Sequence, residues 1–294
     1  MTYSTNADYA DLTASLIPPT NGPNPIAPID FSPEFIDVMS YFNSLFERSE
    51  LSPRSLSITF DAIRLNPANY TAWHFRRRCL FHLGCDLKAE LDSLRSFALS
   101  NSKNYQVWYH RQSLLEKLDN IDLSLQELSF LEELLQNDAK NYHVWTFRQW
   151  ILTWLNSKQQ PTWEAELTFI ETLLNSDVFN YSAWSQRRFI LSQSPIVSFE
   201  DDCSYSIEKI KSSLLNESAW MYLRGLGAER DYPPDVLCFI TENSSSNRFA
   251  ALVLAEVYER TGKLQEAQET FRVLSVIDPI RCEFWKAEAD SINK

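Results

Sequence analysis

Apolar residues recur with helical spacing along most of the chain. Two clear examples follow the spacing i, i+4, i+7 and i+11, namely Leu87, Leu91, Leu94 and Ala98, and then Trp163, Leu167, Ile170 and Leu174. Such spacing places the apolar side chains on one face of an α-helix. From about residue 34 the pattern is helical almost throughout, and the alternation typical of strands is absent. The sequence therefore predicts an all-α fold.

The beginning of the chain has a different character. Residues 1–33 hold six prolines and little periodicity, which is typical of an extended or poorly ordered segment. We therefore predict a Pro-rich N-terminal arm over residues 1–33 and a helical-repeat domain over residues 34–294.

A motif of the form Asn-Tyr-x-x-Trp-x-x-Arg recurs within the predicted domain. Four copies align without gaps, and a degenerate fifth carries its Arg one place late: residues 69–77, 104–111, 141–148, 180–188 and 216–224. The steps between successive Trp residues are 35, 37, 39 and 36 residues, the length of a two-helix repeat. The repeats predict an α–α superhelix, or solenoid, of helical hairpins.

Each motif position has a physical role in this prediction. Asn is a good helix N-cap, so the second helix of each hairpin is expected to begin there. The Tyr, the Trp and a Leu seven residues past the Trp should share one stripe in the inter-helix core. The Arg three residues past the Trp is expected to pair with an acid of the neighbouring unit, such as Glu90, Glu127 or Glu166.

Composition limits the possible partners and location of the protein. The formal charge of −12 argues against nucleic-acid or anionic-membrane binding, since both need a basic surface. No segment approaches the roughly 20 apolar residues of a membrane span, and Met1 to Ser15 lacks the features of a secretory signal. A cytoplasmic location is expected. The five scattered cysteines suit free thiols in a reducing compartment.

Motifs for a complete catalytic site are missing. Cys79, His82 and Cys85 form the only metal-like cluster in the sequence, but core-like residues surround it and a closed zinc site needs a further ligand. The chain also lacks a nucleophile elbow, a glycine-rich phosphate loop and an Asp-rich motif for magnesium diphosphate. We therefore expect no metal site in this chain.

The repeats resemble those of protein prenyltransferase α-subunits, over roughly residues 22–285. Within that family, segments 65–77, 103–108, 139–145 and 216–220 are similar to the subunit shared by protein farnesyltransferase and geranylgeranyltransferase type I. The resemblance implies a crescent-shaped solenoid in an obligate heterodimer with a zinc-binding β-subunit. It further implies transfer of a farnesyl or geranylgeranyl group from isoprenoid diphosphate to the cysteine of a C-terminal CaaX motif, with magnesium as a possible companion of the diphosphate. Substrates would include Ras/Rho-type small GTPases.

The resemblance also assigns site residues. Lys103 matches the catalytic lysine that contacts the diphosphate, Tyr105 matches a tyrosine of the same site, and Gln106 matches the glutamine that binds the terminal carboxylate of the protein substrate. The remaining substrate-binding residues implied are Tyr70, Asn104, Lys140, Asn141, Tyr142 and His143. Cations near a helix N-terminus suit this chemistry because negative charge grows on the departing diphosphate.

Two other interpretations remain open from the sequence. One is the α-subunit of Rab geranylgeranyltransferase, whose repeats differ in these inter-helix loops. The other is a non-catalytic scaffold of tetratricopeptide type that binds peptides, in which case Lys103, Gln106 and His143 would have no catalytic role.

Overall fold

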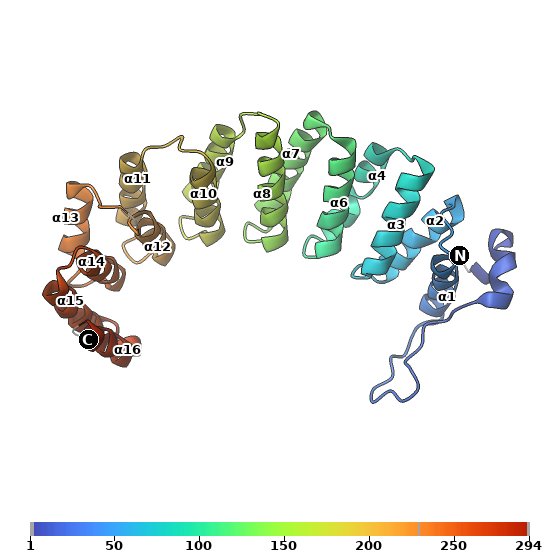
Figure 1. Cartoon of the computed structure of the whole chain (residues 1–294), viewed down its shortest axis with the longest axis horizontal. Helices are drawn as coiled ribbons and strands as arrows, with labels where there is room; N and C mark the ends of the chain where they lie inside the picture. The colour runs from blue at the N-terminus through green and yellow to red at the C-terminus, as the bar shows by residue number, and fades with distance from the viewer. Residues whose placement is uncertain (1–2, 229, 293–294) are drawn as a thin grey trace. The chain divides into compact units, whose positions relative to one another are not determined.

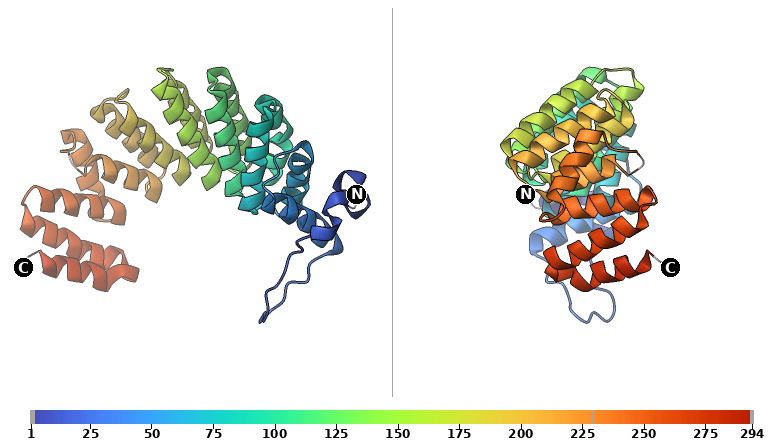
Figure 2. Two further views of the ribbon diagram at one scale, coloured as in Figure 1. Left: turned by 45° about the vertical axis from the view of Figure 1, so that its right-hand side comes forward. Right: turned by 90° about the vertical axis from the view of Figure 1, so that its left-hand side faces the viewer.

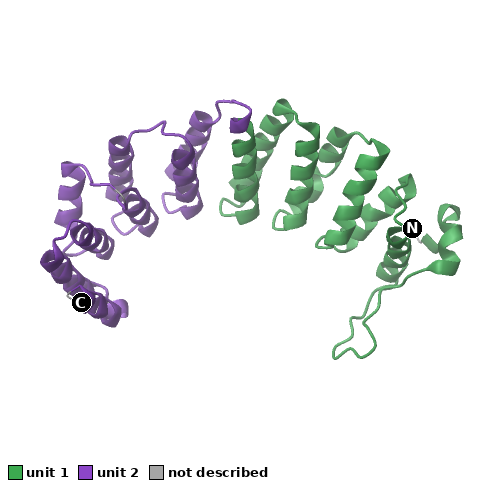
Figure 3. Ribbon diagram, in the orientation of Figure 1, with its two compact units in different colours: residues 1–155 green, residues 156–294 purple. Residues whose placement is uncertain are grey.

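The computed structural model describes residues 3–228 and 230–292. Within these ranges the chain is helical and contains no β-strand, which confirms the predicted all-α class (Figure 1). The chain divides into two compact units, residues 1–155 and residues 156–294 (Figure 3). In each unit, short loops join successive helices into hairpins (Figure 2). The predicted limits of the arm and the repeat domain, 1–33 and 34–294, stay predictions.

The first unit contains three repeat hairpins that follow an N-terminal segment and one further helix. We call the first helix of each hairpin the A helix and the second the B helix. Its elements are η1 (Tyr3–Thr5), η2 (Ala7–Ser15), α1 (Pro33–Glu47), α2 (Pro53–Leu65), α3 (Tyr70–Leu83), α4 (Leu87–Ser93), α5 (Arg95–Ser100), α6 (Tyr105–Leu118), α7 (Ile121–Asn137) and α8 (Tyr142–Ser157). The B helices are therefore α3, α6 and α8.

The second unit continues the hairpin pattern. Its elements are α9 (Trp163–Ser176), α10 (Tyr181–Gln193), α11 (Phe199–Ser212), α12 (Glu217–Leu226), α13 (Pro234–Asn243), α14 (Arg248–Arg260), α15 (Leu264–Ile277), η3 (Pro279–Arg281) and α16 (Cys282–Ser291). Helices α14, α15 and α16 pack around a small apolar cluster in which Phe271 stacks on Trp285.

Buried arginines join successive hairpins, as the sequence predicted. Arg76 of α3 donates from Nε and Nη2 to the two oxygens of Glu90 on α4, at 2.6 and 2.7 Å. Arg111 of α6 pairs in the same way with Glu127 on α7. The second unit has an equivalent ion pair, in which Arg187 Nη2 lies 2.6 Å from Asp202 Oδ1. Each pair fixes the register between neighbouring hairpins because both partners are buried and bound in defined geometry.

The motif arginines of the first unit also bind the A helix of their own hairpin. Arg111 Nη1 donates to the carbonyl of Leu91, and Arg148 Nη1 donates to the carbonyl of Leu128, both at 2.9 Å. Arg148 Nη2 also donates to Glu132 at 3.1 Å. One guanidinium therefore fastens an A helix and a B helix together.

The N-terminal arm differs from the expected extended segment. Residues 3–15 form short 3-10 helices that pack on α1 and α2, with Tyr9 and Leu12 buried. The Tyr9 hydroxyl donates to the carbonyl of Arg54 at 2.8 Å, and Arg54 in turn pairs with Asp11 at 2.6 Å. These tertiary contacts order a segment whose periodicity is too weak to predict a helix.

Candidate functional site

The capping asparagines set the start of each B helix. The Asn side-chain oxygen accepts a hydrogen bond from a backbone N–H two or three residues further on, as predicted. The acceptor and donor residues are Asn69 and Ala72 (3.1 Å), Asn104 and Gln106 (2.9 Å), Asn141 and His143 (3.1 Å), and Asn180 and Ser182 (3.1 Å). Each cap satisfies a backbone donor that would otherwise lack a partner in the first turn.

The same asparagines connect neighbouring loops. The indole Nε1 of Trp73 donates to the carbonyl of Pro67 at 2.8 Å, and the Asn104 side-chain amide donates to that same carbonyl at 2.6 Å. In the next repeat, Asn141 instead donates to the Ser102 hydroxyl at 3.2 Å. The loops that precede α3, α6 and α8 are thus tied together, and residues beside the capping asparagines have fixed positions.

The tyrosine of the motif does not pack where we predicted. Tyr70, Tyr105 and Tyr142 are 71%, 60% and 74% exposed, whereas Trp73 and its equivalents are buried. The prediction that Tyr shares the inter-helix core is therefore wrong. Each Tyr is the first residue of its helix, and its ring is exposed to solvent and not packed between helices.

An open depression of about 710 Å³ collects most of the predicted site residues on the first unit. Lys103, Asn104, Tyr105 and Gln106 contribute from the start of α6, and His143 contributes from the start of α8. The loop residues that complete its wall are Asn66, Pro67, Ala68, Ser100, Asn101 and Ser102. Residues from three successive repeats therefore meet at one surface.

Lys103 is the cation of this depression. Its side chain is 79% exposed, and its Nζ lies 3.2 Å from Asp138 Oδ2. An ion pair this exposed contributes little stability, so the ammonium can turn to a stronger anion at little cost. Lys103 also directly precedes the N-cap of α6, where the helix dipole favours negative charge.

Gln106 and His143 offer further hydrogen-bonding groups. Across residues 3–228 and 230–292, neither the Gln106 amide nor the His143 ring nitrogens have a protein partner. The His143 ring packs edge-to-face on Tyr142, with centroids 5.6 Å apart, and Tyr105 stacks on Tyr109 at 6.1 Å. The arrangement can bind an anion beside exposed aromatic rings.

The other predicted site residues lie outside the depression's lining. Tyr70 begins α3, one repeat earlier, and Tyr142 begins α8. Asn141 is buried behind the lining, where it caps α8 and reaches Ser102. Lys140 is exposed in the preceding loop.

A buried ionic cluster lies beneath the first two B helices. His110 of α6 is fully buried, packs on Trp73, and its Nε2 lies 3.1 Å from Glu90 Oε1. Burial lowers the pKa of His110 to about 4, although the Glu90 carboxylate opposes this shift. Burial raises the pKa of Glu90, but hydrogen bonds from His110 and Arg76 outweigh burial and bring it to about 2. At neutral pH His110 is therefore neutral and Glu90 is ionised.

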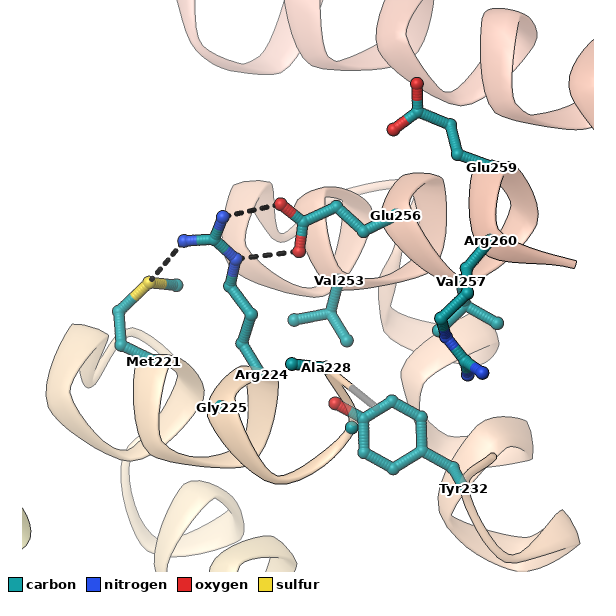
Figure 4. A pocket seen from close by; sticks show the side chains of 11 residues that line it. Met221, Arg224, Gly225, Ala228, Tyr232, Val253, Glu256, Val257, Glu259 and Arg260 are labelled. Carbon is teal, nitrogen blue, oxygen red and sulfur yellow. Dashed lines mark hydrogen bonds and ion pairs between the residues drawn. The ribbon is translucent and has the colours of Figure 1, made fainter. Parts of the chain in front are cut away.

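A second cavity, of about 520 Å³, lies in the second unit between α12 and α14 (Figure 4). Arg224 donates from Nε and Nη2 to the Glu256 carboxylate at 2.7 and 2.5 Å, and this pair crosses one side of the cavity. The buried Tyr232 ring forms another side, and its hydroxyl donates to the carbonyl of Leu223 at 2.7 Å. None of the predicted site residues contributes to this cavity.

In the part of the chain that the structure describes, no three His, Cys, Asp or Glu side chains lie close enough together to hold a metal ion. Cys79 is buried in α3 and Cys85 is half-buried beyond its end. No helix among the described residues is long and apolar enough to cross a membrane.

Comparison with known proteins agrees with this geometry. Residues 53–83, 87–118, 124–155 and 163–194 match the protein prenyltransferase alpha subunit repeat, and they coincide with the first four hairpins. This chain is 37% identical to the protein farnesyltransferase/geranylgeranyltransferase type-1 subunit alpha of Pisum sativum. The match covers 95% of this chain and 91% of the relative. This chain belongs to that family.

Two further comparisons involve Candida albicans. The type-1 subunit alpha of that organism is 32% identical over 97% of both chains. A solved structure of Candida albicans protein geranylgeranyltransferase-I complexed with GGPP aligns with a TM-score of 0.81 and 28% identity, covering 98% of this chain and 99% of that chain. The type-1 α-subunit family therefore accounts for the whole length of the fold.

Some features of the site were not accessible from the sequence. Asp138, the partner of Lys103, lies at the end of α7 and 35 residues further along the chain. The wall formed by Asn66 and Pro67 comes from the loop before α3. The repeat length alone predicts that loops of adjacent hairpins are neighbours, but not which side chains meet.

Proposed function

We propose that this protein is the α-subunit of a heterodimeric CaaX protein prenyltransferase and that the depression around Lys103 contributes to the active site. The observation that carries the proposal is the meeting of Lys103, Tyr105, Gln106 and His143 at one surface of a type-1 α-subunit. The full-length match to type-1 subunits supports this enzyme over the Rab enzyme.

The proposed reaction transfers a farnesyl or geranylgeranyl group. The substrate cysteine loses its thiol proton to solvent, and the thiolate sulfur forms a thioether with the allylic carbon as the carbon–oxygen bond to diphosphate breaks, so that diphosphate leaves with the electron pair of that bond. Lys103 stabilises the negative charge that grows on this leaving group, so its effect is larger in the transition state than in the ground state. The GGPP in the related Candida albicans complex supports an isoprenoid diphosphate as substrate.

The other residues of the depression bind and orient the substrates. The free amide of Gln106 donates to the terminal carboxylate of the CaaX segment without adding charge. His143 adds a donor near the diphosphate, and Tyr105 covers apolar parts of the substrates. Asn104 and Asn141 position these groups by capping α6 and α8. Tyr70, Lys140 and Tyr142 extend the binding surface around the depression.

In this proposal the partner β-subunit binds zinc and the substrate thiolate. Zinc bound there would lower the pKa of the substrate thiol, and any magnesium would accompany the diphosphate. We further propose a cytoplasmic heterodimer that modifies CaaX-terminated small GTPases of Ras/Rho type.

The test begins with assembly. Co-expression with a type-1 β-subunit should give a heterodimer with prenyl-transfer activity, whereas the isolated chain should be inactive. Formation of no heterodimer would favour a peptide-binding scaffold.

The role of Lys103 is tested by single-turnover kinetics of the heterodimer. Lys103→Ala should slow the chemical step by about 100-fold, the typical effect of losing one donor to a developing oxyanion, with little change in peptide affinity. Lys88→Ala is the matched control, since Lys88 is also exposed and ion-paired, with Asp92 at 2.7 Å. An unchanged single-turnover rate for Lys103→Ala would remove its catalytic role.

A further inference from the structure

Exposed aromatic side chains and one buried arginine share a face of the first unit. Tyr70, His74, Arg77 and Phe81 of α3 have the spacing i, i+4, i+7 and i+11, and Tyr105 and Tyr109 of α6 lie beside them. We call these six residues the α3–α6 face. Its rings are strongly exposed, up to 71% for Tyr70, and none of the six residues is acidic. A surface rich in Tyr and Arg is typical of a protein–protein interface.

Arg77 is the unusual residue of this face. Only 9% of it is exposed, and its Nη1 is buried with no hydrogen-bond partner. Its guanidinium lies over the Tyr109 ring, 4.7 Å from the ring centroid, and no carboxylate pairs with it within residues 3–228 and 230–292. Burial lowers the pKa of Arg77. A buried cation without a counter-ion is costly.

Two arginines that are comparable with Arg77 do have a carboxylate partner. The preceding residue, Arg76, has both oxygens of Glu90. Arg224 stands four residues past its repeat Trp, as Arg77 does, and it pairs with Glu256 of α14. Glu256 is nine residues past Asn247, the residue that caps α14. In α6 the residue nine positions past Asn104 is Ser113. A carboxylate at the position of Ser113 could therefore have paired with Arg77, as Glu256 pairs with Arg224.

We propose that the α3–α6 face binds an acidic segment of the catalytic β-subunit and that one carboxylate of that segment pairs with Arg77. The proposal rests on the proposed function, because it assigns a docking surface of the same heterodimer. The face is continuous with the depression, since Tyr105 belongs to both and stacks on Tyr109. A carboxylate over the guanidinium would complete a buried, charge-assisted pair flanked by aromatic rings.

The test compares assembly with the stability of the isolated chain. Arg77→Met should weaken heterodimer formation by about 30-fold or more, the typical effect of truncating one partner of a buried charge pair. The same substitution should leave the urea midpoint of the isolated chain unchanged or raised, because it removes an unpaired buried charge. Arg77→Lys should restore part of the affinity, since it returns the charge without the planar guanidinium.

Arg64→Met is the matched control. It removes one positive charge from the same unit, but Arg64 is more than half exposed and pairs with Glu34 on the surface, so assembly should stay within about twofold of wild type.

Three results would contradict the proposal. The first is assembly of Arg77→Met as tight as that of wild type, and the second is equal weakening by Arg64→Met. The third is a loss of unfolding free energy in the isolated Arg77→Met chain as large as its loss of assembly free energy, which would indicate a structural role. Failure of the wild-type chain to form any heterodimer would instead refute the proposed function.

Discussion

The buried His110 should make the stability of this protein depend on pH in the neutral to mildly acidic range. Its pKa is about 4 in the folded chain, compared with 6.5 for an unperturbed histidine. Between these values the unfolded chain binds a proton that the folded chain does not. The free energy of unfolding therefore rises with pH across this window and falls as pH is lowered from 6.5 toward 4.

The magnitude follows from the two pKa values. At pH 7.5 both states are neutral at His110, so the contribution is close to zero. At pH 5 the unfolded imidazole is almost fully protonated and the folded one is mostly neutral, which corresponds to a loss of about 2 kcal/mol. Glu90 changes the free energy of unfolding little between pH 7.5 and pH 5. Its pKa is about 2 in the folded chain, so the stability it contributes is lost only as pH falls from about 4.5 to about 2.

The assay is urea unfolding followed by circular dichroism at pH 7.5, 6 and 5. His110→Gln can still donate to Glu90 but does not titrate, so the loss between pH 7.5 and 5 should shrink by about 2 kcal/mol. His82→Gln is the control, because His82 is exposed near the end of α3 in the preceding hairpin, and it should keep the wild-type pH dependence. If His110→Gln and wild type lose the same stability over this range, the buried-histidine reasoning is wrong.

Two further substitutions test the packing of the hairpins. Arg111→Met should lower the free energy of unfolding by about 3–5 kcal/mol because it leaves the buried Glu127 carboxylate unpaired, whereas Arg111→Met combined with Glu127→Met should recover most of this loss; a double variant as unstable as the single one in urea unfolding would contradict the explanation. Gly227→Ala should cost about 1–3 kcal/mol, because its Cβ would clash with the Tyr232 ring. Gly225→Ala, two residues earlier with nothing within 4 Å, should be neutral or stabilising by up to about 1 kcal/mol in thermal unfolding, and equal losses in the two variants would disprove the clash.

Local chemistry explains why much of the fold could be predicted. A capping Asn acts on N–H groups within three residues of itself, so the starts of α3, α6, α8 and α10 follow from the motif alone. The pairing of Arg76 with Glu90 was also predicted, because the repeat length places the next A helix beside each B helix. The family resemblance was confirmed on the same residues.

The sequence by itself determined the helical class, the repeat length, the helix starts and the residues proposed to meet the substrates, because each depends on short-range periodicity or a local motif. Only the tertiary structure decided that the motif tyrosines are exposed, that residues 3–15 pack on α1 and α2, and that Arg77 lies buried without a carboxylate. These features depend on which side chains from different hairpins meet in space. Arg224 and Arg77 both stand four residues past a repeat Trp, yet Arg224 pairs with Glu256 whereas Arg77 lies over the Tyr109 ring, because the neighbouring helix and not the arginine's own repeat supplies the partner.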